Sequence, residues 1–200
     1  MTDDSMPLFQ RPITDDPWYL HFHAIGMITV SWTTIETRLD QLIVSLSSLY
    51  PNATADLILS KLGNVTKADL VVTLAKAREW EPEGIDALEH FVKGFNICRE
   101  NRNIIMHARW SEAEDGSAVM AKISASGAMR TFSSDITALR RVAQDMDILN
   151  WYIEQISLVG PRREPFWRSL REHVSKFDDP TPDWPQKHPL PRKLDPLPVK

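Results

Sequence analysis

The feature that most constrains the fold is a stripe of large apolar residues, spaced alternately three and four apart, between positions 32 and 49. Because an α-helix turns once in about 3.6 residues, this spacing places every member on one helical face. We therefore expect one long helix that begins after Pro17 and ends near Tyr50, before Pro51. The stripe consists of Trp32, Ile35, Leu39, Leu42, Leu46 and Leu49.

Stripes of the same period predict two further long helices, and shorter apolar segments after the first helix predict short ones. Ser134 and Asp135 are the expected N-terminal caps of the last long helix, and Gly160 with Pro161 is expected to end it. The expected ranges are 53–62 and 66–80 for short helices, 84–107 and 136–159 for long ones, and 164–176 for one further short helix.

The pattern changes between Arg109 and Phe132. Asp115-Gly116 is typical of a turn, and residues 118–124 and 128–132 have the composition of short strands. We therefore expect a mainly α fold: an antiparallel helical bundle of about five helices, with a small β-hairpin or meander inserted near 109–132.

The last forty residues differ in composition from the rest of the chain. Residues 161–200 contain nine of the fourteen prolines and nine Lys/Arg against six Asp/Glu, whereas residues 1–160 hold 14 Lys/Arg against 21 Asp/Glu. A proline-rich segment of this kind does not form a packed element alone; it can lie over the body, extend to a partner or be disordered. We divide the chain into a helical domain, 1–160, with an N-terminal arm, 1–16, and a basic extension, 161–200.

The composition excludes several classes of protein. Cys98 is the single cysteine, so the chain has neither an intrachain disulfide nor a cysteine-based zinc pattern, and it has no glycine-rich phosphate loop. The acidic, proline-broken start does not resemble a signal peptide, and charged residues interrupt the most apolar stretch. We expect a cytoplasmic protein without a membrane segment, a metal or a cofactor. Its acidic body also disfavours broad nucleic-acid binding, so RNA would be held locally or by an assembled surface.

Polar residues interrupt the stripe of the helix that is expected to end near His107. Steps of three and four from Phe95 and Cys98 lead to Arg102, which places its guanidinium on the buried side. An unpaired buried charge is costly, so we expect an ion pair between Arg102 and Glu36, at the edge of the first helix's stripe.

Arg99, Asn103 and His107 follow one another at intervals of four residues and therefore share one face of the same helix, beside Arg102. Histidine is the usual general acid or base near neutral pH, arginine stabilises charge that develops on phosphate, and an amide orients either group. This combination suits metal-independent cleavage of a phosphodiester. The structural alternatives are an arginine that ties helices together, a histidine that caps a helix and an asparagine on a helix surface.

The element Arg102-Asn103-Ile104-Ile105-Met106-His107, late in a long helix and preceded by a helix bearing Trp-Thr-Thr-Ile-Glu-Thr-Arg-Leu, resembles the HEPN superfamily. The resemblance covers residues 17–160 outside the 109–132 insertion. It implies a small helical domain in which Arg102 and His107 occupy the fixed positions of an Arg-x4-His motif and Asn103 its favoured polar position. Glu36 matches a looser tendency toward a polar residue on the first helix.

Many proteins of this superfamily are ribonucleases of defence and toxin–antitoxin systems. The resemblance implies a homodimer whose two motifs face each other, with the RNA 2′-hydroxyl attacking the adjacent phosphate. Arg102, His107 and Asn103 are then the candidate catalytic residues, Glu36 and Arg99 support them, and RNA and an antitoxin protein are the candidate partners. The alternatives are a non-catalytic helical dimerisation or interaction module and a small-ligand binder, both built on the same polar residues.

Overall fold

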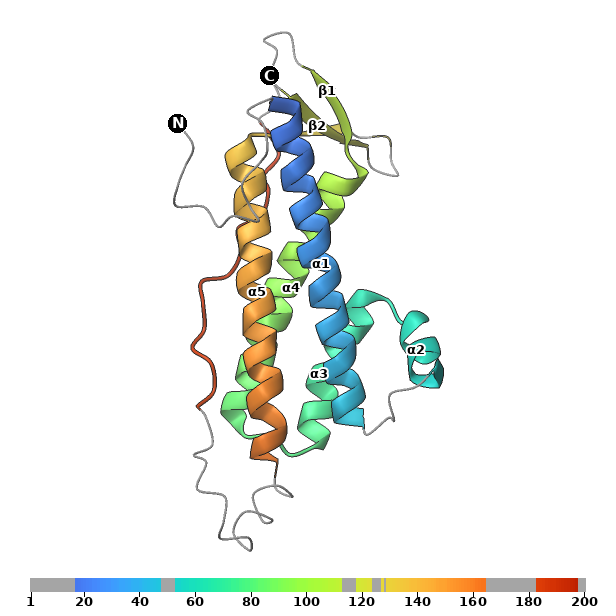
Figure 1. The fold of residues 1–200 in the computed structure, drawn as a ribbon, viewed down its shortest axis with the longest axis vertical. Helices are drawn as coiled ribbons and strands as arrows, with labels where there is room; N and C mark the ends of the chain where they lie inside the picture. The colour runs from blue at the N-terminus through green and yellow to red at the C-terminus, as the bar shows by residue number, and fades with distance from the viewer. Residues whose placement is uncertain are drawn as a thin grey trace, which may run out of the picture. The chain divides into compact units, whose positions relative to one another are not determined.

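The computed structural model describes residues 17–47, 53–112, 118–123, 127, 129–164 and 183–197. These ranges contain five α-helices and one small antiparallel sheet (Figure 1), which confirms the expected fold class. The helices are α1 (Pro17–Ser47), α2 (Ala53–Ser60), α3 (Asn64–Ala77), α4 (Pro82–His107) and α5 (Ile136–Arg163), and the strands are β1 (Arg109–Glu112), β2 (Ala118–Ile123) and β3 (Met129–Ser133). No helix in the described ranges is both long and apolar enough to cross a membrane.

Several helix boundaries differ from the sequence expectation by a few residues, and the largest difference concerns the end of α5. The helix α5 continues through Pro161 to Arg163, so the expectation that Gly160 and Pro161 end it was wrong. A proline removes one N–H donor, and within the last turn of a helix few hydrogen bonds remain for it to disrupt. The antiparallel strands β1, β2 and β3 form a meander, which is one of the two arrangements expected for the insertion. The arm 1–16 and the expected short helix at 164–176, beyond Glu164, lie outside the described residues.

The chain forms two compact units, and α1, α4 and α5 each contribute one part to each unit. The expected boundary at residue 160 therefore falls inside α5, at a change in composition. The described parts of unit 1 are residues 17–32, 98–146 and 191–197, and those of unit 2 are residues 33–97, 147–164 and 183–190.

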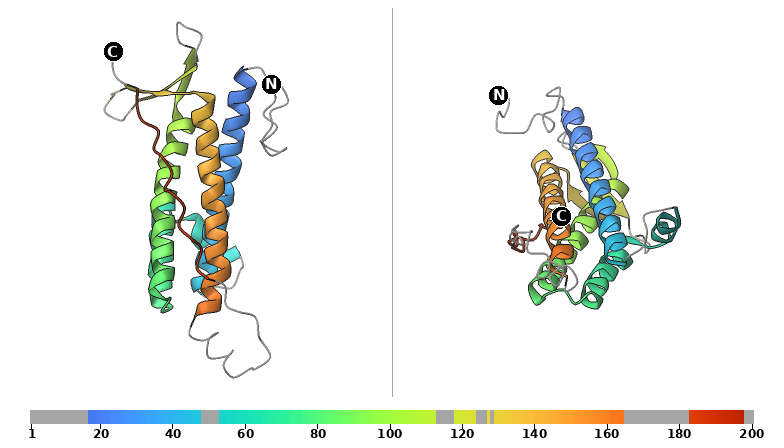
Figure 2. Two further views of the ribbon diagram at one scale, coloured as in Figure 1. Left: turned by 90° about the vertical axis from the view of Figure 1, so that its left-hand side faces the viewer. Right: turned by 60° about the horizontal axis from the view of Figure 1, so that its bottom comes forward.

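Unit 1 combines helix ends with the sheet. The strand order is β1-β2-β3, and Met120 lies opposite Trp110 on one side and Phe132 on the other, so these three side chains line one face. Met120 and Phe132 are buried. At the start of α5, the Asp135 carboxylate accepts a hydrogen bond from the Thr137 amide, which confirms Asp135 as a cap. Figure 2 shows β1 following directly from the end of α4.

Unit 2 is held together by buried stripes and by polar contacts between helices. All stripe residues of α1 from Ile35 to Leu46 are buried. Arg38 joins α1 to α5, because its Nη1 atom lies 2.6 Å from the Glu154 carboxylate and 3.1 Å from the Asn150 carbonyl, to which it donates. Directly after α3, Arg78 donates from Nε to the Leu46 carbonyl at 2.8 Å.

Two tryptophans in unit 2 pack against glycines. The Trp80 and Trp184 rings lie 5.3 Å apart, and their indole N–H groups donate to carboxylates of Glu164 and Glu81. A Cβ atom added at Gly160 would overlap the Trp80 ring, and one at Gly84 would overlap Trp184. Gly160 lies inside α5, where glycine is normally unfavourable, so the close approach of Trp80 explains its presence.

We expect Gly160→Ala to lower the free energy of unfolding by about 1–3 kcal/mol, because overpacking forces the ring from its position. The matched control is Gly26→Ala in α1, where an added Cβ meets nothing within 4 Å. Removing a mid-helix glycine without a clash should instead raise stability by about 0.5–1 kcal/mol. Urea denaturation of both variants measures the difference, and a stabilised Gly160→Ala protein would show that Trp80 is not fixed there.

Candidate functional site

The end of α4 is the part of unit 1 that carries the polar motif, and Trp110 holds it. The Trp110 indole N–H donates to the Ile105 carbonyl at 3.3 Å, so it satisfies one of the carbonyls that a helix end leaves unpaired. The His21 ring lies edge-on to Trp110 with centroids 6.0 Å apart, and its Nε2 atom is 2.8 Å from the Ser134 carbonyl. These contacts fix the turn that ends at His107.

Arg99, Asn103 and His107 form a ridge along the last turns of α4, which we call the polar ridge. Arg99 and Asn103 are half-buried, and His107, the last residue of the helix, is exposed. Neighbouring members of the ridge are four residues apart, so they lie about 40° apart around the helix. The ridge therefore faces outward and ends in a histidine that solvent reaches.

Arg102 lies beside the polar ridge, and its position differs from the sequence expectation. The buried place in the stripe belongs to Asn101, which is 1% exposed, while Arg102 is half-buried at the edge. The Arg102 Nη1 atom donates to the Asn103 side-chain oxygen at 3.2 Å. Asn103 therefore orients the guanidinium, which is one of the roles expected of it.

Both arginines keep a buried donor without a partner. The Nε atoms of Arg99 and Arg102 are buried and make no hydrogen bond to any described residue. An unsatisfied buried donor is costly, and an anion would reach these Nε atoms only after the side chains moved, because the atoms are buried.

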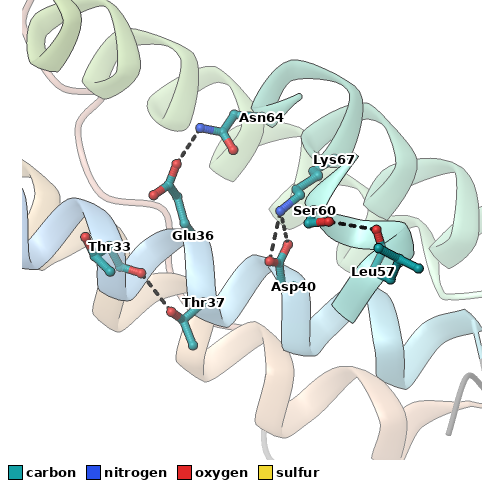
Figure 3. A network of polar contacts seen from close by, with 8 residues as sticks. All are labelled: Thr33, Glu36, Thr37, Asp40, Leu57, Ser60, Asn64 and Lys67. Atoms are coloured by element: carbon teal, nitrogen blue, oxygen red, sulfur yellow. Dashed lines mark hydrogen bonds and ion pairs between the residues drawn. The ribbon is translucent and has the colours of Figure 1, made fainter. Parts of the chain in front are cut away.

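Glu36, the expected partner of Arg102, belongs to unit 2. Figure 3 shows its carboxylate accepting a hydrogen bond from the Asn64 side chain at the start of α3. One turn further along α1, Asp40 forms an ion pair with the nearly buried Lys67 at 2.7 Å. Glu36 thus helps to hold α3 against α1, and its pairing with Arg102 in the other unit remains a prediction.

The spacing of Arg102 and His107 limits what one copy of the chain can do. Five residues of an α-helix correspond to a rotation of roughly 140° and a rise of about 7.5 Å. The two side chains therefore leave α4 in different directions. A site that uses both on one phosphate is more easily built from two copies of α4 than from one.

Sequence reasoning missed the role of three residues in unit 1. Asn101 is a buried polar residue, and a step of three from Cys98 leads to it as directly as a step of four leads to Arg102. Trp110 supports the end of α4 through a hydrogen bond to Ile105, five residues earlier, and His21 supports it through contacts with Trp110 and Ser134, which lie far along the chain. The contacts of His21 leave no local pattern in the sequence.

Cys98 is buried, as its place on the apolar stripe predicts. Burial, together with the negative charge of Asp145, raises the pKa of the Cys98 thiol to about 12. A thiol of this kind is a packing residue and a poor nucleophile, because the thiolate is the reactive form.

The chain was compared with models of protein families, with curated proteins and with solved structures, and none of the three comparisons found a match.

We expect Cys98 to resist thiol reagents in the folded protein at pH 8. With a pKa of about 12, roughly one thiol in 10⁴ is ionised at that pH, and burial blocks access as well. Ellman's reagent should therefore report one reactive thiol only after denaturant is added. Rapid labelling of the folded chain would show that α4 opens in this region.

Proposed function

We propose that this protein is a metal-independent endoribonuclease of HEPN type that acts as a homodimer in the cytoplasm. The observation that carries the proposal is the end of α4, where the polar ridge ends in the exposed His107 five residues after Arg102, whose guanidinium is oriented by Asn103. The sequence element that resembles the HEPN motif thus lies on one accessible helix end. Arg99 in the ridge and Arg102 beside it add two guanidinium groups, whose positive charge suits an anionic substrate.

In the proposed reaction, the RNA 2′-hydroxyl forms a bond to the adjacent phosphorus and the bond from phosphorus to the 5′-oxygen breaks. The products are a 2′,3′-cyclic phosphate and a 5′-hydroxyl. His107 accepts the proton of the attacking hydroxyl or delivers one to the leaving oxygen, and Arg102 stabilises the negative charge on the phosphate oxygens. Asn103 keeps Arg102 in place through the hydrogen bond from its guanidinium.

A homodimer is proposed because Arg102 and His107 of one copy diverge around α4. Across a two-fold axis, Arg102 of one copy can meet His107 of the other. Such an axis also brings together both copies of Arg99, Arg102 and the exposed Arg109. The result is a local positive cleft on a chain whose net charge is −4.

A phage-defence or toxin–antitoxin role, with an antitoxin protein as partner, follows from the HEPN resemblance and is part of the proposal. A toxin that cleaves cellular RNA harms its own cell unless a partner restrains it. The polar ridge is the surface that such an antitoxin would cover.

A non-catalytic interaction module is the second candidate, and one observation favours it. Arg102 donates one guanidinium hydrogen bond to its neighbour Asn103. An arginine held in this way suits a rigid binding surface as well as it suits catalysis. In this case the ridge would hold a second copy or a small anionic ligand without cleaving RNA.

We expect purified protein to cleave RNA in excess EDTA and His107→Ala to lower the rate by at least 10²-fold, since loss of a general acid or base typically costs 10²–10⁴. Fragment ends should carry a 2′,3′-cyclic phosphate. The matched control is His23→Ala, a histidine of unit 1 outside the ridge, which should cleave like wild type. Equal cleavage by His107→Ala would place the activity elsewhere, and no cleavage of any RNA class by wild type would favour the interaction module.

Mixing two inactive variants tests whether the site is shared between copies. A heterodimer of Arg102→Ala and His107→Ala chains keeps one site in which intact Arg102 meets intact His107 of the other copy. Random mixing should therefore restore on the order of a quarter of wild-type activity. Activity that stays at the level of the separate variants would mean that each copy uses its own pair.

A further inference from the structure

Residues 191–197, which we call the C-terminal strap, lie against unit 1 in an extended form. Asn101 holds the strap by its main chain: the Asn101 Nδ2 atom donates to the Arg192 carbonyl at 2.8 Å, and the Leu194 amide donates to the Asn101 Oδ1 atom at 2.9 Å. Asn101 is 1% exposed. The buried Asn101 side chain thus forms hydrogen bonds with two main-chain groups of an extended peptide. Main-chain recognition of this kind is also used when a peptide adds to the edge of a sheet.

The strap also pairs with the sheet of unit 1. The Leu197 amide donates to the Thr131 carbonyl at 2.8 Å, and Pro196 forms an antiparallel bridge with Phe132. The edge of β3 therefore receives the strap as a short additional strand. These contacts involve the main chain, so they depend on an extended shape more than on particular side chains.

The remaining contacts between the strap and unit 1 involve charged groups and one apolar side chain. Lys193 lies 2.7 Å from the Glu100 carboxylate, and the half-buried Asp145 carboxylate accepts a hydrogen bond from the Arg192 amide. Leu194 is 8% exposed and is the one residue of the strap that is buried. The groove thus fits a basic, proline-flanked peptide with one leucine.

We propose that this groove of unit 1, formed by Asn101, Glu100, Asp145 and β3, is a peptide-binding site that also receives the strap of a second copy of this chain. The strap is a replaceable ligand because a single leucine and a few hydrogen bonds hold it against the entropy of ordering it. The sequence of the strap is the one that occupies this groove in the structure. Residues 164–190 separate it from α5, and at up to about 3.3 Å per residue these twenty-seven residues are long enough to reach another copy. The inference does not need RNA cleavage, although exchanged straps would stabilise the proposed homodimer.

The first test uses a fluorescent peptide of residues 189–200 and the full-length Leu194→Asp chain, whose own strap should bind poorly. We expect saturable binding that weakens at least tenfold in the double variant Asn101→Leu/Leu194→Asp, while a scrambled peptide does not bind. Equal affinity for both variants, or no binding to either, would overturn the proposal.

Hydrogen exchange of the wild-type chain keeps the test valid if Leu194→Asp does not fold. Excess unlabelled peptide should displace the resident strap, so the Leu194 and Leu197 amides should exchange several-fold faster while the amides of α4 keep their protection. Unchanged protection of both strap amides at saturating peptide would show that the groove does not exchange its ligand.

Mixing of two full-length variants tests the second copy as the source of the peptide. The Asn101→Leu chain has an intact strap, and the Leu194→Asp chain has an intact groove. At the same total concentration, an equimolar mixture should contain a larger fraction of dimer than either variant alone, measured by sedimentation. Peptide binding without such a complex would overturn the assignment to a second copy, and an equal complex in a mixture of Asn101→Leu with the double variant would place the contact elsewhere.

Discussion

The hydrogen bonds of Asn101 are the interaction on which unit 1 depends. A buried amide without partners costs about 1–3 kcal/mol per unsatisfied group, so a helix with asparagine in its apolar stripe needs a polar neighbour. The strap supplies that neighbour through the Arg192 carbonyl and the Leu194 amide. The strap, near the end of the chain, therefore completes the core of unit 1, which also contains the first part of α1. The turns of α4 that carry Asn101 also present the polar ridge to solvent.

The strength of the strap follows from opposing terms of similar size. Burial of Leu194 contributes about 1.5–3 kcal/mol, and each main-chain hydrogen bond adds about 1 kcal/mol. Ordering one residue costs about 1–2 kcal/mol, so the ordering of seven residues, 191–197, offsets these gains. A segment with this balance opens more readily than the helices beneath it. The low net stability is what allows the groove to act as a peptide site.

The polar ridge and the support beneath it have different physical roles. Asn103 holds the Arg102 guanidinium, and Trp110 with His21 holds the end of α4, so the motif residues project from a fixed helix turn. Catalysis by positioned groups needs such support, because small displacements cost large factors in rate. Glu36 contributes to unit 2 instead, where it binds Asn64 at the start of α3. The ridge and Arg102 therefore supply the proposed chemistry, and Glu36 has a structural contact of its own.

The sequence by itself determined the helices, because apolar residues at helical spacing specify which face of α1, α4 and α5 is buried, whatever lies opposite. The same periodicity placed Arg99, Asn103 and His107 on one face. Periodicity could not decide between Asn101 and Arg102 for the buried position, since steps of three and four are both helical. Only the tertiary structure decided it, because the strap offers main-chain groups that a neutral amide satisfies and a guanidinium, which has no acceptor, cannot. The contacts of His21 with Trp110 and Ser134 likewise depend on partners that are distant in the chain.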